Sequence, residues 1–108
     1  MTTQQTFETY VEDFLSELSD ILTKQRNKNH GPPTLNHQCA ASLWNVYLST
    51  RRKADQNFQL TEADYNAMMM LAKVARVACN PTHKDSWQDS AGYACIGSFF
   101  MEMNDESC

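Results

Sequence analysis

The sequence predicts an all-α protein, a compact four-helix bundle that forms one domain over residues 1–108. Three observations lead to this fold class. Apolar residues in the first quarter of the chain recur at helical spacing, and the second half holds a long apolar stretch with a helix-capping sequence at its start. No segment shows the two-residue alternation of a half-buried strand.

The first predicted helix covers residues 6–26 and is amphipathic. Its apolar residues follow one another three or four positions apart and form a single stripe. The other side is acidic, and Lys24 and Arg26 lie near the end, where the helix macrodipole favours positive charge. Gly31-Pro32-Pro33 is expected to prevent the helix from continuing. The stripe consists of Phe7, Tyr10, Val11, Phe14, Leu15, Leu18, Ile21 and Leu22.

A helical core is predicted over residues 34–103, and its first helix begins near Thr34. This helix is expected to be short, about four turns, with Leu35, Leu43 and Tyr47 on its apolar side. Residues 49–59 have no sustained apolar period and read as a solvated connection.

The next helix has clear start and stop signals. Thr61 can cap the first amides, and Asp64 stands three positions later, as in a capping box. Asn80-Pro81 ends the helix, because the residue before a proline is disfavoured in the α region. Since it is apolar on nearly every side, this helix is predicted to be the central, buried one.

The last predicted helix runs from about Asp85 to Met103. Small residues, among them Gly92 and Gly97, permit close approach of another helix. We therefore expect a homo-oligomer, with these residues as a candidate dimerisation surface.

Composition restricts the class of function. A net charge of −4 gives no positive field for non-specific binding of nucleic acid. No apolar run approaches the length of a membrane span, and the first residues lack the basic start of a secretion signal. The four cysteines are widely spaced and are expected to be reduced thiols. These features predict a cytoplasmic protein that inserts into no membrane.

A polar seam crosses this apolar second half, and it is the candidate functional feature. Lys73 and Arg76 are three residues apart and share a helix face. Buried cations need an acid, an anion or water, and the short connection to the last helix can bring acids close. One interpretation is a structural salt-bridge network between two helices, and the other is a binding pocket. The seam consists of Lys73, Arg76, Asn80, Asp85 and Asp89.

In the binding interpretation, the ligand is an anionic, nucleotide-like small molecule. Lys73 and Arg76 would contact phosphate. The aspartates would contact a ribose hydroxyl or Mg²⁺, although acids at a helix N-terminus are also ordinary dipole compensation. His30, His37 and His83 lack the spacing of a zinc motif, so no resident cofactor is expected. The aromatic and histidine side chains assigned to the rim or to base stacking are Trp44, His83, Trp87 and Tyr93.

The chain also resembles a family of small uncharacterised helical domains found mainly in tailed phages and prophages, over residues 29–98. The resemblance implies a phage protein that acts in the bacterial cytoplasm, and it adds Asn36 to the candidate site. The layout is loosely similar to the all-α nucleotide pyrophosphohydrolases, which hold Mg²⁺ with more carboxylates than Asp85 and Asp89 supply. The residues that carry the resemblance are Gly31, Asn36, Leu43-Trp44, Tyr47-Leu48, Thr61, Asp64, Met69, Lys73, Arg76, His83-Lys84-Asp85-Ser86-Trp87-Gln88-Asp89 and Gly92-Tyr93.

Three functions remain open from the sequence. The first is a phage accessory protein that binds a nucleotide-derived molecule and sequesters a host immune signal. The second is a Mg²⁺-dependent nucleotide hydrolase that uses Asp85 and Asp89. The third is a protein inhibitor whose acidic first helix docks on a host factor.

Overall fold

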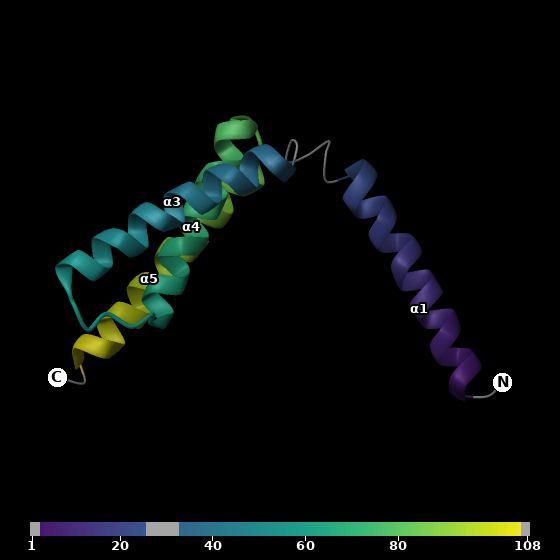
Figure 1. Ribbon diagram of the computed structural model, residues 1–108, viewed down its shortest axis with the longest axis horizontal. Helices are drawn as coiled ribbons and strands as arrows, with labels where there is room; N and C mark the ends of the chain where they lie inside the picture. The colour runs from purple at the N-terminus through teal and green to yellow at the C-terminus, as the bar shows by residue number, and fades with distance from the viewer. Residues whose placement is uncertain (1–2, 26–32, 107–108) are drawn as a thin grey trace.

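The computed structural model describes residues 3–25 and 33–106, and within these ranges it contains helices and no strand (Figure 1). This confirms the predicted all-α fold of four helices. In chain order, the elements are α1 (Thr3–Asp20), a single π-helical turn η1 (Ile21–Gln25), α3 (Pro33–Ala54), α4 (Glu62–Cys79) and α5 (Lys84–Glu106).

Helix α4 lies between α3 and α5 and packs against both, as its apolar composition predicts. Its contacts with α3 are made around Asp64 and Met68, whereas Asn66 and Lys73 meet α5. These two pairs lie on nearly opposite sides of a helix with 3.6 residues per turn. The three helices therefore form an open layer that leaves two sides of α4 uncovered, one marked by Val74 and the other by Tyr65.

Local signals explain the ends of α4. The Thr61 hydroxyl accepts a hydrogen bond from the Asp64 amide at 3.3 Å, and the Asp64 carboxylate accepts one from the Thr61 amide at 3.1 Å. This is the predicted capping box, confirmed on both sides. At the other end, Asn80 leaves the helical conformation before Pro81, while its amide still donates to the Arg76 carbonyl.

The predicted end of α3 is wrong. The helix continues to Ala54, so its 22 residues include the start of the segment expected to be a solvated connection. That segment lacks an apolar period because its side chains are mostly exposed, but its last turn carries Arg51, Arg52 and Lys53, the charge that a helix C-terminus favours. Arg51 also joins the helix to α4 through Asp64.

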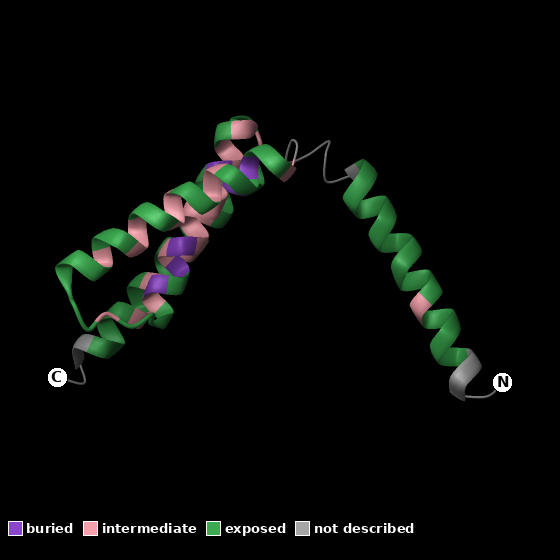
Figure 2. Ribbon diagram, in the orientation of Figure 1, coloured by how far each residue is buried: buried purple, intermediate pink, exposed green. Residues whose placement is uncertain are grey.

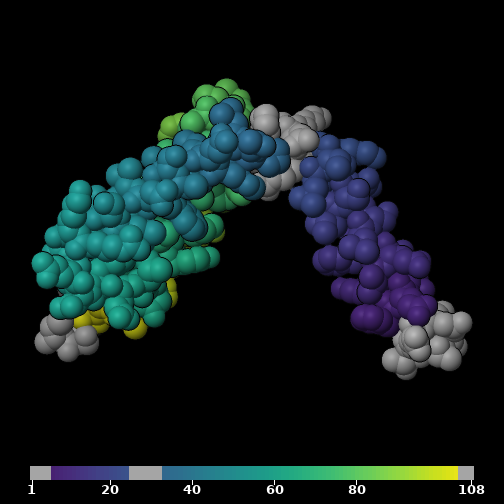
Figure 3. Space-filling view, viewed as in Figure 1, coloured from purple at the N-terminus to yellow at the C-terminus, as the bar shows by residue number. Residues whose placement is uncertain are grey.

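Helix α1 extends away from the other three and makes no extended contact with them (Figures 1 and 3). The apolar stripe of α1, which continues into η1, is almost wholly exposed, from Phe7 at 65% to Leu22 at 47%, with Val11 intermediate (Figure 2). The Cα radius of gyration is 18.7 Å, against about 13 Å for a compact domain of this length. The arrangement is thus more extended than the predicted compact bundle.

The core of the described chain is small. Only Met68 and Ala75 are buried apolar residues among those described, and both belong to α4. Within the same residues, no helix combines the length and the apolar character needed to cross a membrane.

Candidate functional site

The polar seam is built around one ion pair between α4 and α5. The Lys73 ammonium lies 2.9 Å from an Asp89 carboxylate oxygen. The lysine side chain is 12% exposed, whereas the aspartate side chain is 51% exposed. The acid therefore reaches a mostly buried cation from the solvent side.

Arg76 and His83 complete what we call the Lys73–Asp89 cluster, defined by Lys73, Arg76, His83 and Asp89. The hydrogen bond and the charge of Lys73 lower the pKa of Asp89 below its usual value, and the charges of Arg76 and His83 act in the same direction. Arg76 is half-buried and takes part in no ion pair or side-chain hydrogen bond with any residue that the structure describes. The cluster thus carries an excess of positive charge.

The turn between α4 and α5 positions His83. The His83 amide donates to the Asn80 carbonyl at 3.1 Å, and the Ser86 amide donates to the His83 carbonyl at 3.1 Å. Ser86 is fully buried, and its hydroxyl lies 2.9 Å from His83 Nδ1. Contacts with residues at both ends of the turn therefore hold His83 in the cluster.

Trp87 borders this turn with its ring partly open to solvent. Its indole Nε1 donates to the Pro81 carbonyl at 2.9 Å, while the side chain as a whole is exposed. The indole nitrogen is thus occupied, and the exposed ring surface is what the residue can offer to another molecule.

A shallow surface groove of about 320 Å³ adjoins the cluster on α5. It is lined by Gln88, Asp89, Gly92, Tyr93 and Ile96. The groove brings together Asp89 and Tyr93, two of the predicted site residues, with an apolar side chain beside them.

Other predicted site residues lie outside this cluster. Trp44 on α3 donates its indole hydrogen to the Met68 carbonyl at 2.6 Å, a contact that ties α3 to α4. Asn36 is buried in the first turn of α3. Asp85 is exposed in the first turn of α5 and forms no ion pair with the described residues, so Asp89 is the acid that meets the seam.

Sequence reasoning missed a second charged cluster, centred on Asp64. The carboxylate of this buried residue accepts hydrogen bonds from the Tyr47 hydroxyl at 2.5 Å, the Arg51 Nε at 3.0 Å and the Thr61 hydroxyl at 2.9 Å. Arg51 also stacks over the Phe58 ring, 4.6 Å from its centroid. The capping box identified Thr61 and Asp64, but the contacts from α3 required knowing that this helix reaches Ala54.

The pKa values of the Asp64 cluster reflect its burial and its hydrogen bonds. Burial alone would raise the pKa of Asp64, but the hydrogen bonds from Tyr47, Thr61 and Arg51 outweigh it and lower the pKa below its usual value. Burial, with the hydrogen bond to Asp64, raises the pKa of Tyr47 to about 12. Asp64 is therefore ionised and Tyr47 neutral across the physiological range.

Neither cluster assembles a set of metal ligands. No group of three or more histidine, cysteine, aspartate or glutamate side chains converges among the residues that the structure describes. Asp89 faces Lys73, whereas Asp85 is exposed and has no such partner among the described residues. The predicted Mg²⁺ site at these two aspartates gains no support from this geometry.

Comparison with known proteins places the chain among phage proteins of unknown function. It is 34% identical over 92 residues to the Gene 55 protein of Mycobacterium phage D29, covering 84% of this chain and 56% of that protein. It is also 34% identical over 82 residues to the Gene 55 protein of Mycobacterium phage L5, covering 76% of this chain and 48% of that protein. The chain thus spans about half the length of these curated relatives.

No solved structure matches this chain. A family model does, the one described as a domain of unknown function, DUF6378, and it covers residues 13–100. The match begins earlier than the expected resemblance over residues 29–98, so the family includes the second half of α1. The expected relationship to an uncharacterised phage family is confirmed at this level, and the chain belongs to the DUF6378 family.

Proposed function

We propose that this protein binds an anionic, nucleotide-derived small molecule at the Lys73–Asp89 cluster. The observation that carries the proposal is Arg76, a half-buried residue whose guanidinium has no ion pair or side-chain hydrogen bond to any described residue. A guanidinium in such a position is suited to a two-pronged contact with a phosphate.

Lys73 provides a second cationic contact once its ion pair with Asp89 is broken. The aspartate is half exposed, and an ion pair with an exposed partner is weak and easily screened. A ligand phosphate can therefore replace the carboxylate at Lys73 and leave Asp89 in water. Asp89 can instead accept hydrogen bonds from a sugar hydroxyl, which keeps the role predicted for it.

Aromatic groups next to the cluster provide a place for a base. Trp87 presents an exposed ring, and Tyr93 lines the groove that also contains Asp89. Base stacking on such rings contributes about 1–3 kcal/mol per base. The proposal therefore places the phosphate at the turn and the base along α5.

The biological role that follows is sequestration. The curated relatives are proteins of phages, and a phage protein that holds a host nucleotide signal in the bacterial cytoplasm would blunt an immune response without chemistry. The hydrolase alternative, which needs a metal at Asp85 and Asp89, has no supporting observation in the described residues.

Isothermal titration calorimetry with cyclic nucleotides, ADP-ribose derivatives and mononucleotides tests the proposal. We expect at least one compound to bind wild type and to bind Arg76→Ala about 10–100-fold more weakly, the loss of one or two charge-assisted hydrogen bonds. Arg52→Ala is the matched control, since Arg52 is exposed on α3.

Unchanged affinity in the Arg76→Ala variant would show that the cluster is not the site. Absence of heat with every compound would remove the nucleotide proposal itself. Recovering each compound after incubation with Mg²⁺, and checking it by chromatography, separates binding from hydrolysis.

A further inference from the structure

The apolar stripe of α1 has the spacing of a helix that packs against other helices. Phe7, Val11, Phe14 and Leu18 of α1 and Ile21 at the start of η1 alternate four and three residues apart, the pattern of a helix-packing seam. An isolated helix of 18 residues is marginal in water, and most helical stability comes from tertiary packing. The exposed stripe therefore requires an apolar partner.

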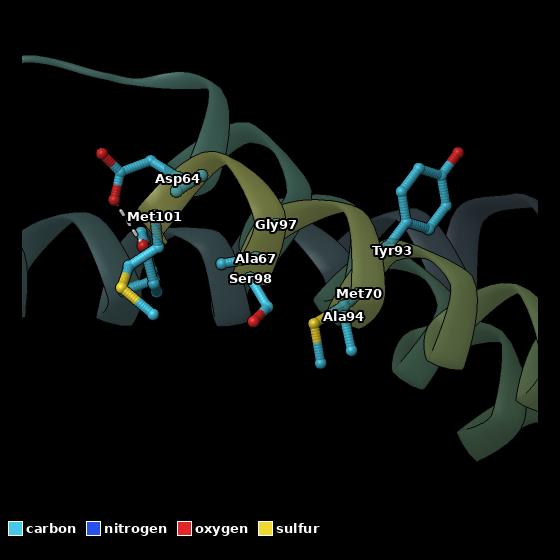
Figure 4. Close-up of a pocket in the computed structure, with 10 residues that line it drawn as sticks. Asp64, Ala67, Met70, Tyr93, Ala94, Gly97, Ser98 and Met101 are labelled. Atoms are coloured by element: carbon cyan, nitrogen blue, oxygen red, sulfur yellow. Dashed lines mark hydrogen bonds between the residues drawn. The ribbon is translucent and has the colours of Figure 1, made fainter. Parts of the chain in front are cut away.

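The side of α4 that carries Ala63, Ala67 and Val74 offers a matching surface. A groove of about 350 Å³ runs there between α3 and α5, floored by Ala63, Ala67 and Met70. Figure 4 shows Met70, Ala94, Ser98 and Met101 pointing to one side of the groove. Val74 falls one turn beyond Met70 on the same face of α4 and is half exposed, so the apolar surface continues along the helix.

The stripe and the groove are complementary in size and length. The stripe carries bulky side chains, among them Phe7 and Phe14, whereas five of the ten residues that line the groove are alanine, glycine or serine. Large side chains against small ones permit close helix packing. Helices α1 and α4 both have 18 residues, so the stripe can follow α4 along its length.

We propose that α1 packs into this groove on a second copy of the chain, and that two copies exchange α1 reciprocally. Each chain carries both the stripe and the groove, so a two-fold exchange covers both stripes and both grooves at once. The exchange gives each three-helix layer a fourth helix, the α1 of the other chain. The groove lies on α4 about a quarter turn from Lys73 and shares Tyr93 with the groove beside the Lys73–Asp89 cluster, but the exchange does not require the proposed ligand.

The position of α1 favours a second copy over the chain's own α1. The helix points away from its own layer (Figures 1 and 3), so its apolar stripe is open to another chain.

The area is sufficient for a stable dimer. The large apolar side chains of α1 are about half exposed, so one helix offers on the order of 500 Å² of apolar surface. Two such helices and the two grooves that they cover exceed the roughly 1,000 Å² expected of a specific interface.

Native mass spectrometry and light scattering of the full chain under reducing conditions test the exchange. We expect a dimer for wild type, and about 100-fold weaker dimerisation for Phe14→Asp on α1 and for Val74→Asp on α4, because each places a charge in the apolar contact. Tyr65→Asp is the matched control, an exposed side chain of α4 on the opposite face. Circular dichroism verifies that each variant stays helical.

A mixing experiment identifies exchange between chains. An equimolar mixture of the Phe14→Asp and Val74→Asp chains retains one intact α1 and one intact groove, so we expect mixed dimers where neither variant dimerises alone. Hydrogen exchange of wild type should show α1 amides whose protection rises with protein concentration.

Three outcomes would overturn the proposal. The first is a wild-type monomer, whether its α1 is protected by its own groove or left open for a different partner protein. The second is a dimer that resists both substitutions, which would indicate another surface such as the small residues of α5. The third is failure of the two variants to form mixed dimers.

Discussion

Asp64 gives the most direct test of how the layer is held together. Its carboxylate joins the start of α4 to the end of α3, because Tyr47 and Arg51 donate to one oxygen and Thr61 donates to the other. Asp64→Asn keeps the size of the side chain but removes the charge and turns one acceptor into a donor. Donors from α3 or from the cap then lose their acceptor.

The magnitude follows from the exposure of each partner. Arg51 is 39% exposed, so its guanidinium regains water and its loss is small. Tyr47 is half-buried, and a donor left unsatisfied there costs about 1–3 kcal/mol. Weakening the Thr61 cap adds about 0.5–2 kcal/mol. We expect Asp64→Asn to lower the free energy of unfolding by about 2–4 kcal/mol.

Thermal unfolding followed by circular dichroism measures this loss. In a small domain each 1 kcal/mol lowers Tm by about 4–8 °C, so a fall of roughly 10–25 °C is expected. Asp85→Asn is the matched control, an exposed aspartate whose replacement should leave Tm nearly unchanged. If Asp64→Asn stays within about 0.5 kcal/mol of wild type, the cluster does not hold α3 on α4.

The lowered pKa of Asp64 also determines how the stability of the folded chain changes in acid. Because the pKa of Asp64 in the folded chain is below its usual 3.8, its stabilisation is present above that value and is lost as pH falls through the lower, folded pKa. The pH dependence of unfolding below pH 4 should therefore be shallower in Asp64→Asn than in wild type. Equal slopes would mean that other carboxylates cause the acid sensitivity.

Three further predictions concern single contacts of the layer. The pKa of Tyr47 is raised from 10.0 to about 12, so its contribution to stability is complete below pH 10 and is lost as pH rises toward 12. Tyr47→Phe should therefore remove the loss of stability between pH 10 and 12. An unchanged pH dependence would contradict this prediction. A Cβ at Gly97 would lie 3.0 Å from the Asn66 Cβ, whereas a Cβ at Gly92 would have nothing within 4 Å. In chemical denaturation, Gly97→Ala should therefore lower the free energy of unfolding by about 1–3 kcal/mol, and Gly92→Ala should raise it by about 0.5–1 kcal/mol. The reverse order would refute this packing. Trp44→Phe removes the hydrogen bond from α3 to α4 and should lower Tm by several degrees. An unchanged Tm would mean that this hydrogen bond does not stabilise the contact between the two helices.

Features fixed by neighbours in the sequence were the ones that the sequence predicted well. The capping box of α4 and its end at Asn80 depend on residues within one helical turn, and both are confirmed. The end of α3 was missed because its last turns are stabilised by Arg51, whose partner Asp64 lies thirteen residues away on another helix. The amphipathic stripe of α1 was identified correctly, but the stripe alone does not specify which apolar surface covers it.

One of the two charged clusters was predicted and the other was not, for the same physical reason. Lys73 and Arg76 stood out as the cations of an apolar helix, and a short turn left few acids within their reach. Asp64 looked like an ordinary cap residue, although it is 4% exposed and bound from two helices. The Asp64 carboxylate already accepts several hydrogen bonds, and a ligand would have to displace them all at once.

The two clusters are therefore suited to different work. Asp64 is buried and ionised by its own neighbours, so it contributes to stability and leaves little charge for a ligand. At the other end of the layer, Lys73 has a single acid partner that is half exposed, and Arg76 has no ion pair among the described residues. Replacing Asp89 by a phosphate would exchange one weak surface contact for contacts to two cations. This difference in how well each charge is already satisfied is the physical reason to seek the ligand at Arg76 and not at Asp64.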